Sequence, residues 1–177
     1  MFDGAYPYSG LGISSNITKQ HLLKTYKFFF NTEEGVRYII NVEHYNNNIF
    51  ILKFHPRKLK SNKYKYNIVT NTGHFSKIVR TNINVLIDFY KKYPNSHFGF
   101  IGAMTYCQIK KCYTESQSIT SRFKLYKYAV ENLINPDDFE HHFDEENNTY
   151  LLINLKCNNI DYIKDVSKIM FEDYMNY

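Results

Sequence analysis

Residues 98–134 decide the fold of this chain, and they read FGFIGAMTYCQIKKCYTESQSITSRFKLYKYAVENLI. The stretch predicts a buried strand that ends at Gly102, a loop with little acidic charge, and a helix that begins at about Thr120. On a helical wheel at about 100° per residue, the apolar side chains of that helix share one face. The face comprises Leu125, Ala129, Val130 and Leu133, with Phe123 and Ile134 at its flank. We therefore expect this face to be buried in the core.

Two polar side chains, Arg122 and Tyr126, lie within the apolar arc of the predicted helix, whereas Lys124 points away from it. An arginine on the inward face of a first helical turn needs an anion, a carbonyl or a carboxylate as its partner, because an unpaired buried charge is costly. The sequence does not say which of these partners Arg122 has.

The start of this helix could bind a phosphate. Free N–H groups and the helix dipole favour an anion there, and the guanidinium of Arg122 would add bidentate donors. Ser118 and Thr120 lie at the helix start, and Gly102 ends the strand before it. The alternative is that Arg122 bridges to a carbonyl or carboxylate and fixes the helix to the sheet, with Tyr126 packed beside it. The chain has no glycine-rich GxxxxGK[ST] loop, so the sequence argues against a nucleotide triphosphatase. We also expect no cofactor.

The composition is that of one folded domain. The chain has 177 residues, of which 44% are apolar, so it can bury a substantial core. Aromatic residues are unusually frequent, at 18%. AT-rich codon usage is one explanation, since it raises Tyr, Phe, Asn, Ile and Lys together, and selection for rings that stack on bases is the other.

Charge is unevenly distributed around a formal net value of +5. Residues 53–65 contain six basic side chains and no acid, including Arg57 and Lys58, and residues 110–127 are also basic. Tyrosines lie within both segments, a combination that suits base stacking together with phosphate contacts. The acidic residues concentrate in residues 131–146, which could contact a charged protein partner. A solvated basic surface without a ligand remains the alternative.

Other features point to a cytosolic protein. The three cysteines, Cys107, Cys112 and Cys157, are odd in number and lack CxxC spacing, as is typical of reduced thiols. No run approaches the roughly 18 apolar residues of a membrane span. Residues 1–16 lack the basic start and apolar middle of a signal peptide. We expect a soluble cytoplasmic protein that does not bind a membrane, of unknown oligomeric state.

Apolar periodicity predicts the order ββββ-α-β-α-ββ-α. This order indicates a single α+β domain, in which a largely antiparallel sheet, a meander plus a C-terminal hairpin, carries about three helices on one face. Residues 1–16 are expected to form an N-terminal arm or loop, and residues 17–177 the domain. The predicted strands are residues 26–30, 36–45, 49–55, 64–69, 97–103, 139–143 and 149–155, and the predicted helices are residues 74–93, 120–134 and 159–174.

Two further motifs contain residue types that could carry chemistry. His141 and His142 are adjacent within a predicted strand, so they face opposite sides and cannot both bind one ion without distortion; we expect no metal site there. Cys107 and Cys112 lie beside basic residues that would lower a thiol pKa. No histidine and acid are placed to complete a triad, so the sequence nominates no catalytic residue.

Three pieces of the sequence together resemble a family of small bacterial proteins with a domain of unknown function. They are Asn71-Thr72-Gly73 before the first helix, Thr81, Phe89 and Lys92-Tyr93-Pro94 towards its end, and the strand ending at Gly102 with residues 118–126 beyond it. In that family a Gly-Ser-Thr step leads into Arg-x-x-Leu-Tyr, which Arg122, Leu125 and Tyr126 match. The resemblance covers about residues 26–134. The chain departs from the family pattern in two places. His74 stands where the family has an acid, and residues 104–117 are an insertion between Gly102 and the Ser-Thr step. The resemblance implies a fold rather than an activity.

These observations favour a small bacterial accessory or interaction protein that contacts nucleic acid or a charged protein partner, as one half of a toxin–antitoxin or phage-defence pair would. The alternative is a small nuclease or nucleotide-acting enzyme that uses Arg122 and Tyr126. A third possibility is that Arg122 is purely structural.

Overall fold

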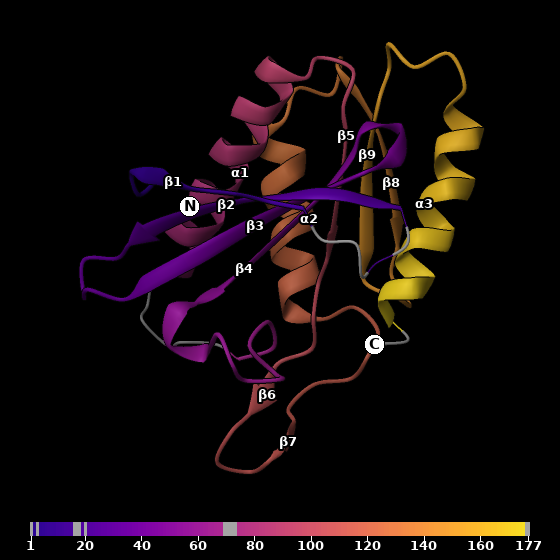
Figure 1. Cartoon of the computed structure of the whole chain (residues 1–177). Coiled ribbons are helices and arrows are strands. Elements are labelled where there is room, and N and C mark those ends of the chain that lie inside the picture. Colours follow the sequence, from indigo (N-terminus) through magenta and orange to yellow (C-terminus); the bar gives the residue numbers. More distant parts are fainter. Residues whose placement is uncertain (1, 3, 16–18, 20, 69–73, 176–177) are drawn as a thin grey trace.

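A computed structural model gives the structure of the chain and describes residues 2, 4–15, 19, 21–68 and 74–175. Its main feature is a seven-stranded sheet in the order β1-β2-β3-β4-β5-β9-β8 (Figure 1). Neighbouring strands are antiparallel except for β4 and β5, which are parallel. The strands are β1 (Tyr8–Ser14), β2 (Leu22–Asn31), β3 (Arg37–Tyr45), β4 (Ile49–Pro56), β5 (His97–Ile101), β8 (Phe139–Asp144) and β9 (Thr149–Asn154), and β6 (Tyr106–Cys107) and β7 (Cys112–Tyr113) form a separate hairpin. The predicted single α+β domain with a largely antiparallel sheet is confirmed.

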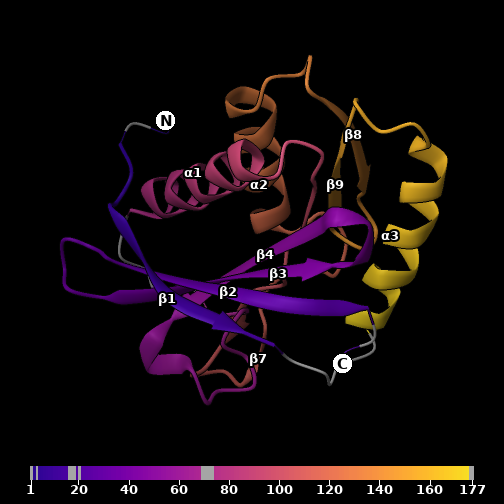
Figure 2. The same ribbon diagram turned by 45° about the horizontal axis from the view of Figure 1, so that its top comes forward.

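Helices cover both faces of this sheet (Figure 2). Helices α1 (Phe75–Lys92) and α2 (Ser121–Leu133) pack on one face, over a core that includes Phe50 and Leu52 of β4. Helix α3 (Ile160–Met175) packs on the other face, against Ile49 and Ile51 of the same strand. The expectation that all helices share one face is therefore wrong for α3. Because successive side chains of a strand point to opposite faces, apolar residues at consecutive positions of β4 require cover on both sides.

The meander of β2, β3 and β4 follows from strand alternation. Tyr38, Ile40 and Val42 of β3 all point into the core beneath α1 and α2, as the alternating pattern predicts. The reversal between β3 and β4 passes through Asn47, with φ of 60°, and Asn48, with φ of 55°. Asparagine tolerates this left-handed conformation better than most residues, so the predicted turn is confirmed.

Two expected elements differ in the structure. The arm or loop expected for residues 1–16 contains a strand, β1, which forms the edge of the sheet beside β2. The strand expected for residues 64–69 is wrong for residues 64–67, which form turns instead, with the N–H of Asn67 donating to the carbonyl of Tyr64 at 2.8 Å. The physical reason is that β5, not this segment, pairs with the second edge of β4. Val69 lies outside the described residues, as do Asn71-Thr72-Gly73 of the family resemblance.

The parallel pair of β4 and β5 is short. Its register contains only the pairs Ile49↔His97, Phe50↔Phe98 and Ile51↔Gly99. Beyond these pairs β4 continues to pair with β3 as far as Pro56, and β5 continues to pair with β9 as far as Ile101. The sheet therefore opens between the carboxyl ends of β4 and β5.

Stability is expected to fall as the pH is lowered from about 6.5 towards 4, because His97 is buried as a neutral imidazole. Its side chain is 4% exposed, and its Nδ1 accepts a hydrogen bond from the backbone N–H of Asn154 at 3.1 Å. Burial lowers the pKa of His97 from 6.5 to about 4. Between these values the unfolded chain binds a proton that the folded protein excludes, so the free energy of unfolding falls by up to about 3 kcal/mol.

Thermal melts across this pH range would test the expectation, with His97→Asn as the matched variant. Asparagine keeps an acceptor near the position of Nδ1 but does not titrate. We expect a shallower pH dependence in the variant, although His44 and His55, whose pKa values burial also lowers, act in the same direction in both proteins. An identical pH slope in the two proteins would contradict this role of His97.

Candidate functional site

Gly102 and the first turn of α2 are in direct contact, although residues 104–117 separate them in the sequence. A Cβ atom on Gly102 would lie 2.5 Å from the Cβ of Phe123 and 2.6 Å from its Cα and backbone nitrogen. The hydroxyl of Thr120 donates to the Gly102 carbonyl at 2.7 Å and accepts from the N–H of Phe123 at 3.2 Å. Thr120 is thus the N-cap of α2 and fixes the helix start to the end of β5.

Three N–H groups at the start of α2, those of Thr120, Ser121 and Phe123, are bonded within the protein. The N–H of Thr120 donates to Asn148 Oδ1 at 2.7 Å, and that of Ser121 donates to Glu115 Oε2 at 2.9 Å. Burial opposes the ionisation of Glu115, but hydrogen bonds from the N–H groups of Ser121 and Thr105 lower its pKa overall. Ser118 is exposed beside this turn. The carboxylate of Glu115 therefore occupies the position at the helix start that the sequence suggested for a phosphate. This role of Glu115 could have been predicted from the sequence, because Glu115 is the one acid in the loop before the helix.

Arg122 is buried, as its place on the helical wheel predicts. Its side chain is 8% exposed, and its Nη1 donates to the backbone carbonyl of Tyr66. Its Nε has no hydrogen-bond acceptor, and Arg122 forms no ion pair with any acid of the described chain. Among the described residues the partner of Arg122 is therefore a carbonyl, which leaves the positive charge without a counter-charge there. Lys124 is exposed, again as the wheel predicts.

A cavity of about 220 Å³ lies where the sheet opens, between the carboxyl ends of β4 and β5 and helices α1 and α2. Arg122 and Tyr126 of α2, Asn82 of α1 and Lys53 of β4 line it together with apolar side chains. Burial raises the pKa of Tyr126 to about 12, so its hydroxyl stays protonated. Burial also lowers the pKa of Lys53 to about 7 in spite of the neighbouring Glu43, whose Oε2 lies 3.3 Å from its Nζ. Arg122 and Tyr126 thus line the same cavity.

Two basic segments that are far apart in the sequence, residues 57–67 and 104–115, lie against each other beyond the opening of the sheet (Figures 1 and 2). The N–H of Tyr106 donates to the carbonyl of Asn67 at 3.0 Å, and Asn67 Nδ2 donates to the carbonyl of Met104 at 2.9 Å. We call these two segments the basic lobe. Its cations are Arg57, Lys58, Lys60, Lys63, Lys65, Lys110 and Lys111, and its one acid is Glu115.

Three tyrosines form a cluster within the basic lobe. The rings of Tyr64 and Tyr106 are stacked, with centroids 3.7 Å apart and planes at 14°. Tyr113 packs edge-on against both, and its side chain is 44% exposed. The Nζ of Lys63 lies 4.7 Å from the centroid of the Tyr64 ring. Cations and aromatic rings therefore occur together on this part of the surface. The sequence showed this combination within each segment, but it did not show that the two segments lie side by side.

The acidic region 131–146 lies at the end of α2 and in the hairpin of β8 and β9. Several of its carboxylates have partners inside the protein. Glu140 Oε1 lies 2.7 Å from His142 Nε2 and 3.4 Å from Lys164 Nζ, and Glu145 Oε1 lies 3.3 Å from Lys127 Nζ. These ion pairs reduce the negative charge that the region presents to a partner.

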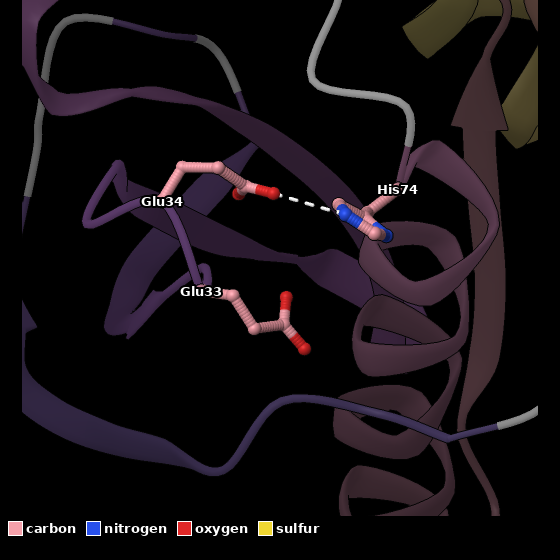
Figure 3. Close-up of side chains that lie close together, drawn as sticks. All are labelled: Glu33, Glu34 and His74. Atoms are coloured by element: carbon pink, nitrogen blue, oxygen red, sulfur yellow. Dashed lines mark ion pairs between the residues drawn. The ribbon is translucent and has the colours of Figure 1, made fainter.

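A group of potential metal ligands, Glu33, Glu34 and His74, lies on the surface near the start of α1 (Figure 3). The ligand atoms lie within 4.8 Å of one another, and His74 Nε2 is 2.9 Å from Glu34 Oε1. Both oxygens of Glu33 are already bonded, Oε1 to Lys77 Nζ and Oε2 to the hydroxyl of Tyr6 at 2.6 Å. Hydrogen bonds from Lys77 and Tyr6 lower the pKa of Glu33 to about 2. A cation would have to compete with these contacts, so this group is not assigned as a site.

His141 and His142 make separate contacts in β8. His141 Nδ1 lies 2.7 Å from the hydroxyl of Tyr150, whereas His142 Nε2 is paired with Glu140. The two imidazoles do not converge on one point, as their adjacent positions in a strand predict.

Comparisons of the chain with protein-family models, with curated proteins and with solved structures find no match. The resemblance to a bacterial family therefore stays a prediction, and function has to be argued from the geometry of this chain. Among the residues that the structure describes, no helix combines the length and the apolar character needed to cross a membrane.

Proposed function

We propose that the chain binds single-stranded nucleic acid through the basic lobe, as a non-catalytic interaction protein. The observation that carries this proposal is that residues 57–67 and 104–115 bring seven cations and the cluster of Tyr64, Tyr106 and Tyr113 onto one part of the surface. Side chains of lysine and arginine neutralise phosphates and release counterions, which supplies affinity without sequence preference.

Aromatic rings favour a single strand over a duplex, since unpaired bases can stack on them. Tyr113 is the half-exposed ring of the cluster, and Tyr64 and Tyr106 support it from behind. The hairpin of β6 and β7 also presents Ile109, which is 94% exposed, next to Lys110 and Lys111. A flexible strand can follow such an uneven surface more readily than a rigid helix.

Two other functions receive less support. A nuclease that uses Arg122 and Tyr126 would need both side chains at the surface that contacts nucleic acid, whereas Arg122 is buried and bonded to the Tyr66 carbonyl. A charged protein partner at residues 131–146 would meet seven acidic side chains, two of which, Glu140 and Glu145, are already paired with Lys127, His142 and Lys164.

Removing two cations of the basic lobe is expected to weaken binding of a single-stranded oligonucleotide by roughly 20-fold at about 0.1 M salt. The variant is Lys58→Ala with Lys110→Ala, which takes one exposed lysine from each segment. The measurement is the fluorescence anisotropy of labelled RNA and DNA strands. The reason is that each phosphate contact to a single strand contributes about 0.7 to the salt slope, so two contacts contribute about 1.4.

The matched control is Lys91→Ala with Lys168→Ala, which removes the same charge from exposed positions on α1 and α3. It is expected to leave the affinity nearly unchanged, and thermal melts should show both double variants folded. If both double variants lost the same affinity, the effect would come from the net charge of the protein. That result would overturn the assignment of the binding site to the basic lobe.

A further inference from the structure

The cavity of about 220 Å³ occupies a position in the fold that suits a ligand. It lies where β4 and β5, the parallel pair of the sheet, diverge after their last pair, Ile51 and Gly99. In α/β sheets, ligands bind in the crevice that forms where neighbouring parallel strands diverge at their carboxyl ends. The cavity is also walled by two helices, so its lining is preformed by rigid elements.

The charge inside this cavity is unbalanced. Lys53 and Arg122 both line it, and Lys53 is paired with Glu43 at 3.3 Å. Arg122 is nine-tenths buried, is bonded only to the Tyr66 carbonyl, and has no carboxylate partner in the described chain. A buried guanidinium without a counter-charge is costly, and an anion that enters the cavity would relieve that cost.

The polar atoms around Arg122 indicate how such an anion would be held. Nη1 is committed to Tyr66, which leaves the Nε–Nη2 edge of the guanidinium, and Nε has no acceptor among the described residues. That edge offers two parallel N–H donors, which matches the two oxygens of a carboxylate. Asn82 is 4% exposed, lines the same cavity and has an Oδ1 without a donor, so it could accept a hydrogen bond from the ligand.

The other residues that line the cavity indicate the size and the apolar character of the rest of the ligand. Phe54, Phe100, Ile83 and Val130 are among the apolar side chains that line the cavity. A cavity of about 150 Å³ lined by such residues is large enough for benzene, so this one accommodates a ring of that size with a short polar extension. A phosphate is less suitable than a carboxylate, because the helix N–H groups that would contribute to its site are bonded to Asn148 and Glu115.

We infer that the cavity between β4, β5, α1 and α2 is a binding site for a small carboxylic acid with a ring-sized apolar body, whose carboxylate pairs with Arg122. This site adjoins the basic lobe, since Tyr66 lines the cavity and its carbonyl binds Arg122, but the inference does not depend on nucleic-acid binding. The charged head lies against Arg122, and the ring lies between the aromatic wall of the sheet and the aliphatic side chains of α1 and α2.

Phenylacetate and its neutral isostere phenylacetamide are the probes that test this inference, with inorganic phosphate as a third. Calorimetric titration is expected to show phenylacetate binding the wild-type protein roughly 10- to 100-fold more tightly than phenylacetamide, since hydrogen bonds to a charged group are stronger than neutral ones. In Arg122→Met, which keeps an unbranched apolar stem and removes the guanidinium with its charge, this preference is expected to vanish. The affinity for phenylacetamide should persist there, which shows that the cavity is intact.

A second variant, Val130→Phe, fills the cavity from α2 and is expected to abolish binding of both organic probes. Equal affinities for phenylacetate and phenylacetamide in the wild type would overturn the role of Arg122. Binding of inorganic phosphate in place of phenylacetate, or the failure of every probe to bind the folded protein, would overturn the proposed ligand class. Oligonucleotide affinity measured on Val130→Phe, which keeps Arg122 and its hydrogen bond to the Tyr66 carbonyl, should equal that of the wild type. This measurement keeps the test of the cavity distinct from that of the basic lobe.

Discussion

Replacing Gly102 with alanine is expected to lower the free energy of unfolding by about 3 kcal/mol, the upper end of the range for overpacking. The added Cβ would lie 2.5 Å from the Cβ of Phe123 and 2.6 Å from its Cα and backbone nitrogen. Phe123 is 1% exposed and belongs to the core, so α2 itself would have to move away from β5. That movement would also stretch the hydrogen bond from Thr120 to the Gly102 carbonyl.

Gly10→Ala is the matched control for this substitution. Gly10 lies in β1, and a Cβ placed there would meet no atom within 4 Å. Urea titrations of both variants are expected to show a large loss for Gly102→Ala and little change for Gly10→Ala. Equal stabilities of Gly102→Ala and the wild type would mean that α2 does not lie as close to β5 as the structure has it.

Local periodicity was sufficient to predict most of the elements that form the core. The wheel of α2 follows from apolar spacing, and the same spacing identified Arg122 as a polar side chain on a buried face. Arg122 is buried in the structure. Alternation likewise predicted β3, β4 and the hairpin of β8 and β9. These predictions are correct because the burial of one face requires apolar residues at fixed intervals along the sequence.

The wrong predictions concern features that regular apolar spacing does not specify. Strand β1 contains Gly10 and Gly12, and most of its residues are exposed at the edge of the sheet, so it has no alternating apolar face. The amphipathic pattern of α3 shows that one side is buried but not against which face of the sheet. The pairing of β4 with β5 depends on a segment 48 residues further along, which no local pattern specifies.

Neither candidate site could be assembled from sequence alone. The carbonyl that binds Arg122 belongs to Tyr66, 56 residues away, and the side chain that binds the Thr120 N–H belongs to Asn148, 28 residues away. The sequence identified Arg122 as a candidate for anion binding and residues 57–65 as basic, but it placed both in one hypothesis about nucleic acid. The structure separates them, since Arg122 lines an interior cavity and the lysines lie in the basic lobe.

Raising the salt concentration from about 50 to about 200 mM is expected to weaken binding of a single strand to the wild-type protein by up to about 10³-fold. The basic lobe carries seven cations. If all seven contact phosphates, the logarithm of the affinity falls with the logarithm of the salt concentration with a slope of about −5, at about 0.7 per contact. Anisotropy titrations over a salt series measure this slope directly.

The intercept of the same series separates the contribution of the tyrosines from that of the cations. Stacking of a base on an aromatic ring contributes about 1–3 kcal/mol and does not depend on counterion release. Tyr113→Ala is therefore expected to shift the whole line to lower affinity without changing its slope, whereas Lys58→Ala with Lys110→Ala should make the slope shallower by about 1.4. A wild-type slope near zero would contradict phosphate binding by the basic lobe, because binding by stacking or by apolar contacts alone releases no condensed counterions.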